Sequence, residues 1–168
     1  MKKGVLYINN GEGFVSEAAI SAQTLKEHNP DLHVTIISDQ KEVPEVFDNH
    51  IKIEDPNREV ISKVIHMEKT PYEKTLFLDS DIYVDGEIEE VFQILDEFDI
   101  AASYATDQKN LRETVPQAFP FFNSGVIAFE ENHRVESFLQ EWKQNYLDEA
   151  EGNSEEVETE EGLKKMPV

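Results

Sequence analysis

The most informative absence in this sequence is cysteine, because its 168 residues include none. Disulfide bonds, thiolate metal centres and cysteine nucleophiles are therefore excluded. Long apolar runs are missing as well. The N-terminal stretch has only a few apolar residues before Asn9, too few for the core of a signal peptide, and no other segment approaches a membrane span. These absences predict a soluble, cytoplasmic protein without a transmembrane segment.

Basic residues are scarce, with 15 lysines and arginines against 36 aspartates and glutamates, so the net charge is −21. Nucleic acid is therefore excluded as a partner, because phosphate binding needs a basic surface. Two interpretations of this acidity stay open. Mutual repulsion of carboxylates keeps an ordinary acidic protein soluble, whereas a dense carboxylate surface also suits a high-salt cytoplasm that screens the charges.

What the sequence does contain is a regular alternation of apolar runs and amphipathic stretches. Strands are predicted at 4–9, 33–38, 50–54, 75–79, 99–105 and 125–130, and helices at 15–28, 58–67, 87–98 and 135–147. This alternation predicts an α/β fold in which helices flank both faces of a mostly parallel sheet. The length suits one domain over 1–147, and the glutamate-rich composition of 148–168 predicts a disordered tail.

Two acids follow one of the predicted strands, because the run TLFLDSD places Asp79 and Asp81 one residue apart at its end. If the strand continues through them, their carboxylates share one side, where two hard oxygen donors suit Mn²⁺ or Mg²⁺. The alternative is a turn in which an aspartate caps the next segment. Spacing alone leaves both interpretations open, although ligands of parallel α/β sheets bind beyond the carboxyl ends of strands.

Three stretches together resemble the GT-A glycosyltransferases. Residues 71–92 resemble the family's Asp-x-Asp passage from strand to helix, FPFFNSGVIAFE (119–130) resembles its Asn-Ser-Gly turn, and 4–39 resembles its opening strand and helix. The glycogenin-like enzymes of glycosyltransferase family 8 are the most similar group. The resemblance implies a GT-A fold and a hexosyltransferase that uses a nucleotide-diphosphate sugar, with UDP as the expected nucleotide.

The resemblance also implies roles for the residues around the two acids. Asp79 and Asp81 match the pair that holds a divalent metal, Mn²⁺ or Mg²⁺, and Asp79 also contacts the donor. Lys63, sixteen residues before Asp79, matches a lysine that faces the diphosphate or the sugar. Without the resemblance, Lys63 would be interpreted as an exposed helix lysine.

Four further residues match positions that contact the donor. Asn10 and Phe14 match the loop after the first strand that contacts the nucleoside, where an aromatic ring could stack on uracil. Asn123 and Ser124 match the turn that contacts the donor sugar, and Gly125 permits close approach of the backbone. The alternatives are that Phe14 staples the start of a helix and that Asn123 and Ser124 serve only the turn.

The chain departs from the family pattern after its last predicted helix. Family members continue with an Asp-Gln segment, acceptor-binding elements and a late metal-binding histidine, which have no counterpart between Leu147 and Val168. The resemblance therefore predicts a C-terminally truncated member, with no catalytic residue and no acceptor assigned. A non-catalytic nucleotide-sugar-binding protein or partner subunit is the main alternative, and a homo-oligomer is left open.

A second enzyme class is a further alternative. LFLDSDIYV also resembles the Asp-x-Asp-x-Thr start of haloacid-dehalogenase-type phosphatases, in which the first aspartate is a phosphorylated nucleophile. Tyr83 stands where that motif has threonine, and the motif usually opens the domain, so this alternative is the weaker one.

Overall fold

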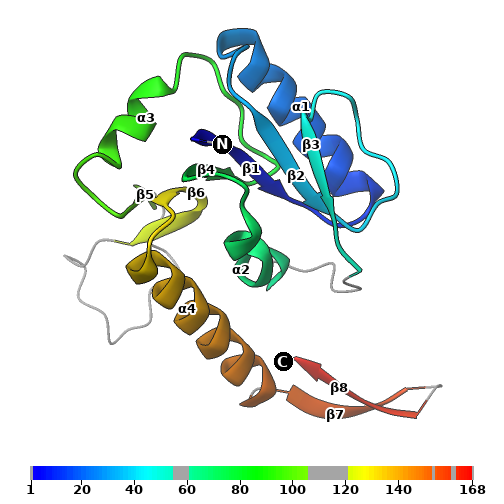
Figure 1. Cartoon of the computed structure of the whole chain (residues 1–168). Helices are drawn as coiled ribbons and strands as arrows, with labels where there is room; N and C mark the ends of the chain where they lie inside the picture. The colour runs from blue at the N-terminus through cyan, green and yellow to red at the C-terminus, as the bar shows by residue number, and fades with distance from the viewer. Residues whose placement is uncertain (1, 55–60, 106–120, 153, 160–161, 168) are drawn as a thin grey trace.

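The computed structural model describes residues 2–54, 61–105, 121–152, 154–159 and 162–167 (Figure 1). At its centre is a six-stranded sheet in the order β3-β2-β1-β4-β6-β5. The strands are β1 (Lys3–Ile8), β2 (Val34–Ser38), β3 (Asn49–Lys52), β4 (Lys74–Leu78), β5 (Ile100–Tyr104) and β6 (Phe122–Glu130). The first four strands run parallel, and β6 runs antiparallel to both of its neighbours.

Helices cover both faces of this sheet (Figure 1). They are α1 (Glu12–His28), α2 (Ile61–His66), the 3₁₀ helix η1 (Met67–Lys69), α3 (Glu89–Ile94) and α4 (His133–Gly152). Alternate residues of a strand face opposite sides, so Val5 and Tyr7 pack with α1 and α3, whereas Leu6 and Ile8 pack with η1 and α4. No helix in the described ranges is long and apolar enough to cross a membrane.

The predicted α/β fold is confirmed, with helices on both faces of the sheet. Each predicted strand and helix is present with its ends shifted by a few residues, and residues 58–60 of one predicted helix lie outside the described part. The sheet is more mixed than predicted, because β6 is antiparallel. The sequence contains no helical pattern between the last two strands, and an antiparallel partner needs no helical crossover.

The C-terminal segment 148–168, predicted as a disordered tail, has regular elements among its described residues. Helix α4 continues to Gly152, and β7 (Ser154–Thr159) pairs antiparallel with β8 (Gly162–Pro167) in a sheet of their own. A two-stranded hairpin by itself is marginally stable in water. The domain boundary at 147 stays a prediction.

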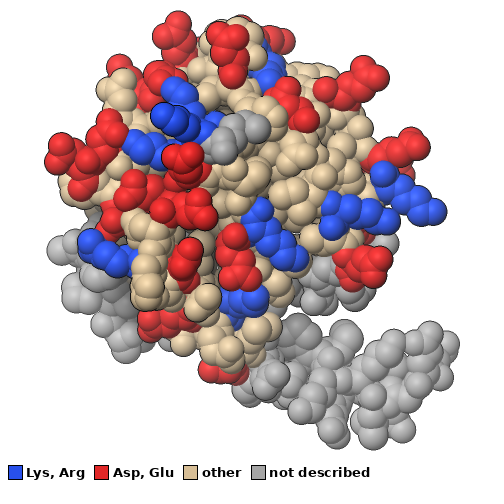
Figure 2. All heavy atoms as spheres, in the orientation of Figure 1, with Lys and Arg blue, Asp and Glu red and all other residues tan. Residues whose placement is uncertain are grey.

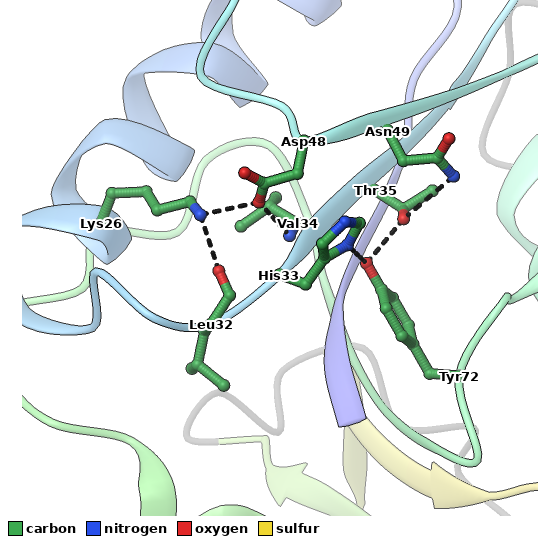
Figure 3. Close-up of polar contacts among 8 residues, drawn as sticks. All are labelled: Lys26, Leu32, His33, Val34, Thr35, Asp48, Asn49 and Tyr72. Atoms are coloured by element: carbon green, nitrogen blue, oxygen red, sulfur yellow. Dashed lines mark hydrogen bonds and ion pairs between the residues drawn. The ribbon is translucent and has the colours of Figure 1, made fainter. Parts of the chain in front are cut away.

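A set of polar contacts ties α1 to the strands that follow it (Figure 3). The Lys26 ammonium donates to Leu32 O and to Asp48 Oδ2, each at 2.7 Å, and Val34 N–H donates to the same Oδ2 at 2.7 Å. Burial of the Asp48 carboxyl raises its pKa, but the hydrogen bonds from Lys26 and Val34 outweigh burial and hold the pKa below its ordinary value. The link between β2 and β3 is therefore fixed by one carboxylate.

Tyr72 makes a second link, between the segment before β4 and strand β2 (Figure 3). Its hydroxyl lies 2.6 Å from Thr35 Oγ1 and 2.8 Å from His33 Nδ1, and its side chain is fully buried. Burial raises the pKa of Tyr72 to about 12, and the nearby charge of Asp48 adds to this, although the Thr35 hydrogen bond lowers it.

Candidate functional site

A cleft of about 630 Å³ opens where the parallel strands end. Its lining comes from the ends of β1 and β4, the first turns of α1, the start of α2 and the far part of α4. Five of the predicted site residues line it together: Asn10, Phe14, Lys63, Asp79 and Asp81. The cleft is therefore at the sheet edge where α/β folds bind their ligands.

Lys63 and Asp79 form an ion pair at the cleft. The Lys63 ammonium lies 3.0 Å from both Oδ1 and Oδ2 of Asp79. The same nitrogen lies 3.4 Å from Ser124 O and 5.6 Å from the centre of the Phe77 ring. Lys63 is only 9% exposed, so the interpretation as an exposed helix lysine is wrong. Its charge is compensated by one acid at the cleft wall.

Residues Asn123–Gly125, predicted as a turn, lie within strand β6 and support Asp79 from the other side. Asp79 N–H donates to Gly125 O at 2.8 Å, and Gly125 N–H donates to Asn123 Oδ1 at 2.6 Å. A Cβ on Gly125 would lie 2.9 Å from Asn123 Oδ1 and 3.0 Å from Asp79 Oδ2. The backbone of β6 therefore approaches Asp79 as closely as only glycine permits.

An irregularity in β6 causes this close approach. The pairing with β5 jumps from Ala102↔Ile127 to Ser103↔Asn123, so the extra residues of β6 bulge out between the two pairs. Bulges of this kind re-aim strands beside binding sites. Neither Asn123 nor Ser124 is part of the cleft lining. They act on the site through the bulge, because Ser124 O contacts Lys63 and the Asn123 side chain holds Gly125.

Asp81 differs from Asp79 in its surroundings. Strand β4 ends at Leu78, and Ile82 N–H contacts Asp79 O at 3.4 Å, so the two acids lie in a turn and the alternation of a strand does not apply to them. Asp81 is exposed and forms no ion pair with the described residues. Both acids nevertheless line the same cleft.

The number of acids at the cleft decides which kind of metal site they fit. Within the described ranges, no group of three or more histidines, aspartates or glutamates could enclose a cation. Mg²⁺ and Mn²⁺ typically bind through one or two carboxylates together with water and substrate phosphates. Asp79 and Asp81 fit that kind of shared site and do not fit a closed protein cage. The metal itself stays a prediction.

The end of the cleft at β1 is built from the loop before α1. Asn10 is buried, donates through Nδ2 to Ser62 Oγ at 2.8 Å and accepts at Oδ1 from Asp39 N–H at 3.2 Å. Asp39 in turn accepts from Gly11 N–H at 2.8 Å, and Gly11 has a φ of +80°, which favours glycine. Phe14 is 54% exposed, so its ring is accessible from solvent and is not packed away as a helix staple.

Some lining residues are absent from the sequence-based prediction. They include Glu17, Ser62, Ser80 and Tyr146. Ser80 Oγ donates to Glu17 Oε2 at 2.5 Å across the cleft. Asp39 supports the cleft and ends a predicted strand beside β1, so the rule about carboxyl ends of strands could have found it. Tyr146 comes from the far part of α4, and no pattern near it indicates the cleft.

Comparison with known proteins gives matches of structure only. No protein-family model and no curated protein matches the sequence. The fold is similar to that of the glycosyltransferase GlyE of Streptococcus pneumoniae TIGR4, with a TM-score of 0.64 and 18% identity over 90% of this chain and 39% of that chain.

Two further solved structures have the same fold. The galactosyltransferase LgtC, solved with donor and acceptor sugar analogs, has a TM-score of 0.55 and 13% identity over 86% of this chain and 65% of that chain. The bifunctional glycosyltransferase WbbM has a TM-score of 0.52 and 15% identity over 84% of this chain and 33% of that chain. This chain therefore spans 33% to 65% of the length of these proteins. Its fold is the GT-A-like α/β fold of glycosyltransferases.

Proposed function

We propose that this chain is the donor-binding domain of a glycosyltransferase that takes a hexose from a UDP-linked donor, with Mn²⁺ or Mg²⁺ at Asp79 and Asp81. One observation carries the proposal: Asn10, Phe14, Lys63 and the two acids line a single cleft at the carboxyl ends of the parallel strands. The likeness to LgtC, a galactosyltransferase solved with a donor sugar analog, supports it at the level of the fold.

The nucleoside would lie at the β1 end of the cleft. Phe14 presents an exposed ring, and a ring of this kind stacks on a nucleobase whatever its hydrogen-bonding edge. The Asn10 side chain is held in place by Ser62 and by the backbone of Asp39, so the wall beside the ring is rigid. Rigid positioning of the donor reduces the entropy that is lost on binding.

The diphosphate would lie at the β4 end, near Lys63 and the two acids. The Lys63 ammonium offers a positive charge to phosphate oxygens, and Asp81 offers a hard oxygen donor that forms no ion pair with the described residues. When bound, a divalent cation supplies neutralising charge to the diphosphate leaving group. The residues of the chain position the donor and leave the diphosphate poised to depart.

Donor binding without transfer is the second candidate. The residues predicted for the donor side line the described cleft, and none of them is assigned to an acceptor or to catalysis. The phosphatase alternative is disfavoured, because the solved structures with a similar fold are glycosyltransferases and Tyr83 stands where the phosphatase motif has threonine.

The test is calorimetric titration with UDP in the presence of Mn²⁺, together with thermal unfolding. Ligand at roughly a hundredfold excess over Kd stabilises the folded state by about 2.7 kcal/mol, so the Tm should rise by several degrees. We expect Asp81→Asn to abolish this rise, because it removes the carboxylate that forms no ion pair with the described residues. Asp85→Asn, which changes an exposed acid outside the cleft lining, is the matched control.

The outcomes separate the candidates. Release of free sugar from UDP-sugars, or its transfer, would identify an enzyme, whereas tight binding of UDP with intact donors would identify a binding protein. A phosphoaspartate at Asp79 would support the phosphatase instead. If UDP with Mn²⁺ leaves the Tm unchanged, or if Asp81→Asn binds UDP as the unmodified protein does, the proposed metal and diphosphate site is wrong.

A further inference from the structure

We propose that Lys63 and the divalent cation are rivals for Asp79, so that the protein accepts the metal and the diphosphate only together. The inference rests on the proposed donor binding. It adds that the metal and the diphosphate each need the other in order to bind tightly. Lys63 is then an internal counter-ion: it occupies the carboxylate in the empty cleft and leaves it when the diphosphate arrives.

A cation that approaches Asp79 meets Lys63 at both oxygens, although the Asp79 side chain is 35% exposed. Both oxygens of the carboxylate accept from the Lys63 ammonium at 3.0 Å. The backbone of Gly125 lies beside Oδ2, so near that a Cβ there would be 3.0 Å from that oxygen. A cation that binds Asp79 must therefore share the carboxylate with Lys63 or displace it.

Sharing is unfavourable, because it places a divalent ion and an ammonium within a few ångströms of each other around one negative charge. Like charges at that distance repel strongly where solvent is largely excluded, and Lys63 is only 9% exposed. Mn²⁺ alone would find Asp79 paired with Lys63, which leaves Asp81 and Glu17 as the acids of the cleft lining that could balance its charge. The free protein should therefore bind Mn²⁺ weakly.

Displacement is unfavourable as well, unless another anion is present. Among the described residues, the remaining contacts of Lys63 are the Ser124 carbonyl at 3.4 Å and the face of the Phe77 ring at 5.6 Å. Neither carries a formal charge, and a buried ammonium without an anion is costly. A diphosphate at the cleft supplies that anion. It can accept from Lys63 and, in the same complex, share the cation with Asp79 and Asp81.

The two ligands are therefore coupled through one side chain. Coupling between binding sites is reciprocal, so a diphosphate that strengthens metal binding is itself strengthened by the metal to the same degree. A phosphate group without the cation would meet the acids of Asp81 and Glu17 on the cleft wall, which repel it. Lys63 thus makes the cleft selective for the metal complex of the diphosphate over either component.

The test measures Mn²⁺ binding to the whole chain without nucleotide, by the loss of the free-ion signal in electron paramagnetic resonance. Lys63→Met removes the rival charge and keeps an apolar stem. We expect it to tighten the binding of Mn²⁺ alone by about tenfold or more, within the range of ordinary coupling between sites. In the same variant the Tm shift caused by UDP with Mn²⁺ should shrink, because the diphosphate loses its ammonium.

Two further variants keep the test decisive. Lys63→Gln retains a hydrogen-bond donor for Asp79 without the charge, so it serves if Lys63→Met unfolds, and it should also bind Mn²⁺ alone more tightly. Lys74→Met is the matched control, because Lys74 pairs with Asp96 at 2.5 Å outside the cleft and should leave Mn²⁺ binding unchanged.

The inference and the proposed function fail in different ways. If UDP with Mn²⁺ binds the unmodified protein but Lys63→Met and Lys63→Gln leave the affinity for Mn²⁺ alone unchanged, the rivalry is wrong and donor binding stands. The same holds if the unmodified protein binds Mn²⁺ alone as tightly as it does with UDP. If no combination of UDP and Mn²⁺ binds, the donor site fails and the rivalry fails with it.

Discussion

At the scale of single residues, the site depends on how near a few atoms come to Asp79. Gly125 faces its carboxylate from β6, and Lys63 faces it from α2. The contact with Gly125 is steric, and the contact with Lys63 is electrostatic. The two can therefore be changed independently, and each change has its own signature in binding and in stability.

The contact with Gly125 predicts a penalty for any side chain at that position. The Cβ of Gly125→Ala would lie 2.9 Å from Asn123 Oδ1 and 3.0 Å from Asp79 Oδ2, so these side chains or the bulge of β6 must shift. We expect a loss of roughly 1–3 kcal/mol in the free energy of unfolding, as for other overpacked sites, and weaker UDP binding with Mn²⁺. Urea unfolding and calorimetry measure the two effects.

Gly86→Ala is the control for this change, because a Cβ there meets no atom within 4 Å. Its stability should stay close to that of the unmodified protein. Equal losses in the two variants would show that the crowding around Asp79 is not the cause.

At the scale of elements, two buried tyrosines join helices and strands of the core. Tyr72 links to β2 through Thr35, and the Tyr7 hydroxyl of β1 lies 2.9 Å from Ser21 Oγ of α1. Burial raises the pKa of both phenols to about 12, although the Ser21 and Thr35 hydrogen bonds lower it. The ordinary value for tyrosine is 10.0.

These two shifts predict the alkaline limit of the fold. Between pH 10 and about 12 the folded chain keeps two protons that the unfolded chain has lost, so the free energy of unfolding falls as the pH rises through this window. Below pH 10 this contribution to stability is fully present. We expect tyrosinate absorbance at 295 nm to show the buried tyrosines ionising late, together with loss of the far-ultraviolet circular dichroism signal.

Tyr83 provides the control, because it is 70% exposed and its hydroxyl is not part of the buried links. Tyr83→Phe should leave the dependence of stability on pH unchanged. The interpretation would be wrong if all five tyrosines ionised near pH 10 in a chain that stayed folded.

At the scale of the whole molecule, the dominant property is charge. Figure 2 shows acidic side chains over much of the visible surface and fewer basic ones among them, as the net charge of −21 requires. Repulsion among these carboxylates opposes the compact state, and salt screens it over a distance of about 10 Å at 0.1 M. The surface therefore makes stability depend on ionic strength.

We expect the Tm to rise as potassium chloride is raised from a few millimolar to about 0.5 M, because shorter screening lengths weaken the repulsion. Differential scanning calorimetry at several salt concentrations measures the slope. A high-salt origin predicts loss of the folded state below roughly 0.1 M salt, whereas an ordinary acidic protein stays folded there. A Tm that does not change with salt would contradict both interpretations.

The sequence predicted the fold well, because each element carries its own pattern of apolar residues. For the cleft, it predicted those lining residues that match motifs of the family it resembles, such as Asp79 and Lys63. It did not predict Tyr146 or Glu17, since their places in the cleft depend on how two helices pack over the sheet. The sequence left open whether Asp79 and Asp81 lie in a strand or in a turn, because spacing alone does not show where a strand ends. The structure has them in a turn.

The order of the strands affects how the protein folds during its synthesis on the ribosome. Strand β6 lies between β4 and β5, although β5 is synthesised before it. In the nascent chain, β5 therefore has no partner strand until β6 has been synthesised. Its apolar residues stay exposed until then. The backbone contact that positions Asp79 comes from the same late strand. Binding competence is thus one of the last properties that the growing chain acquires.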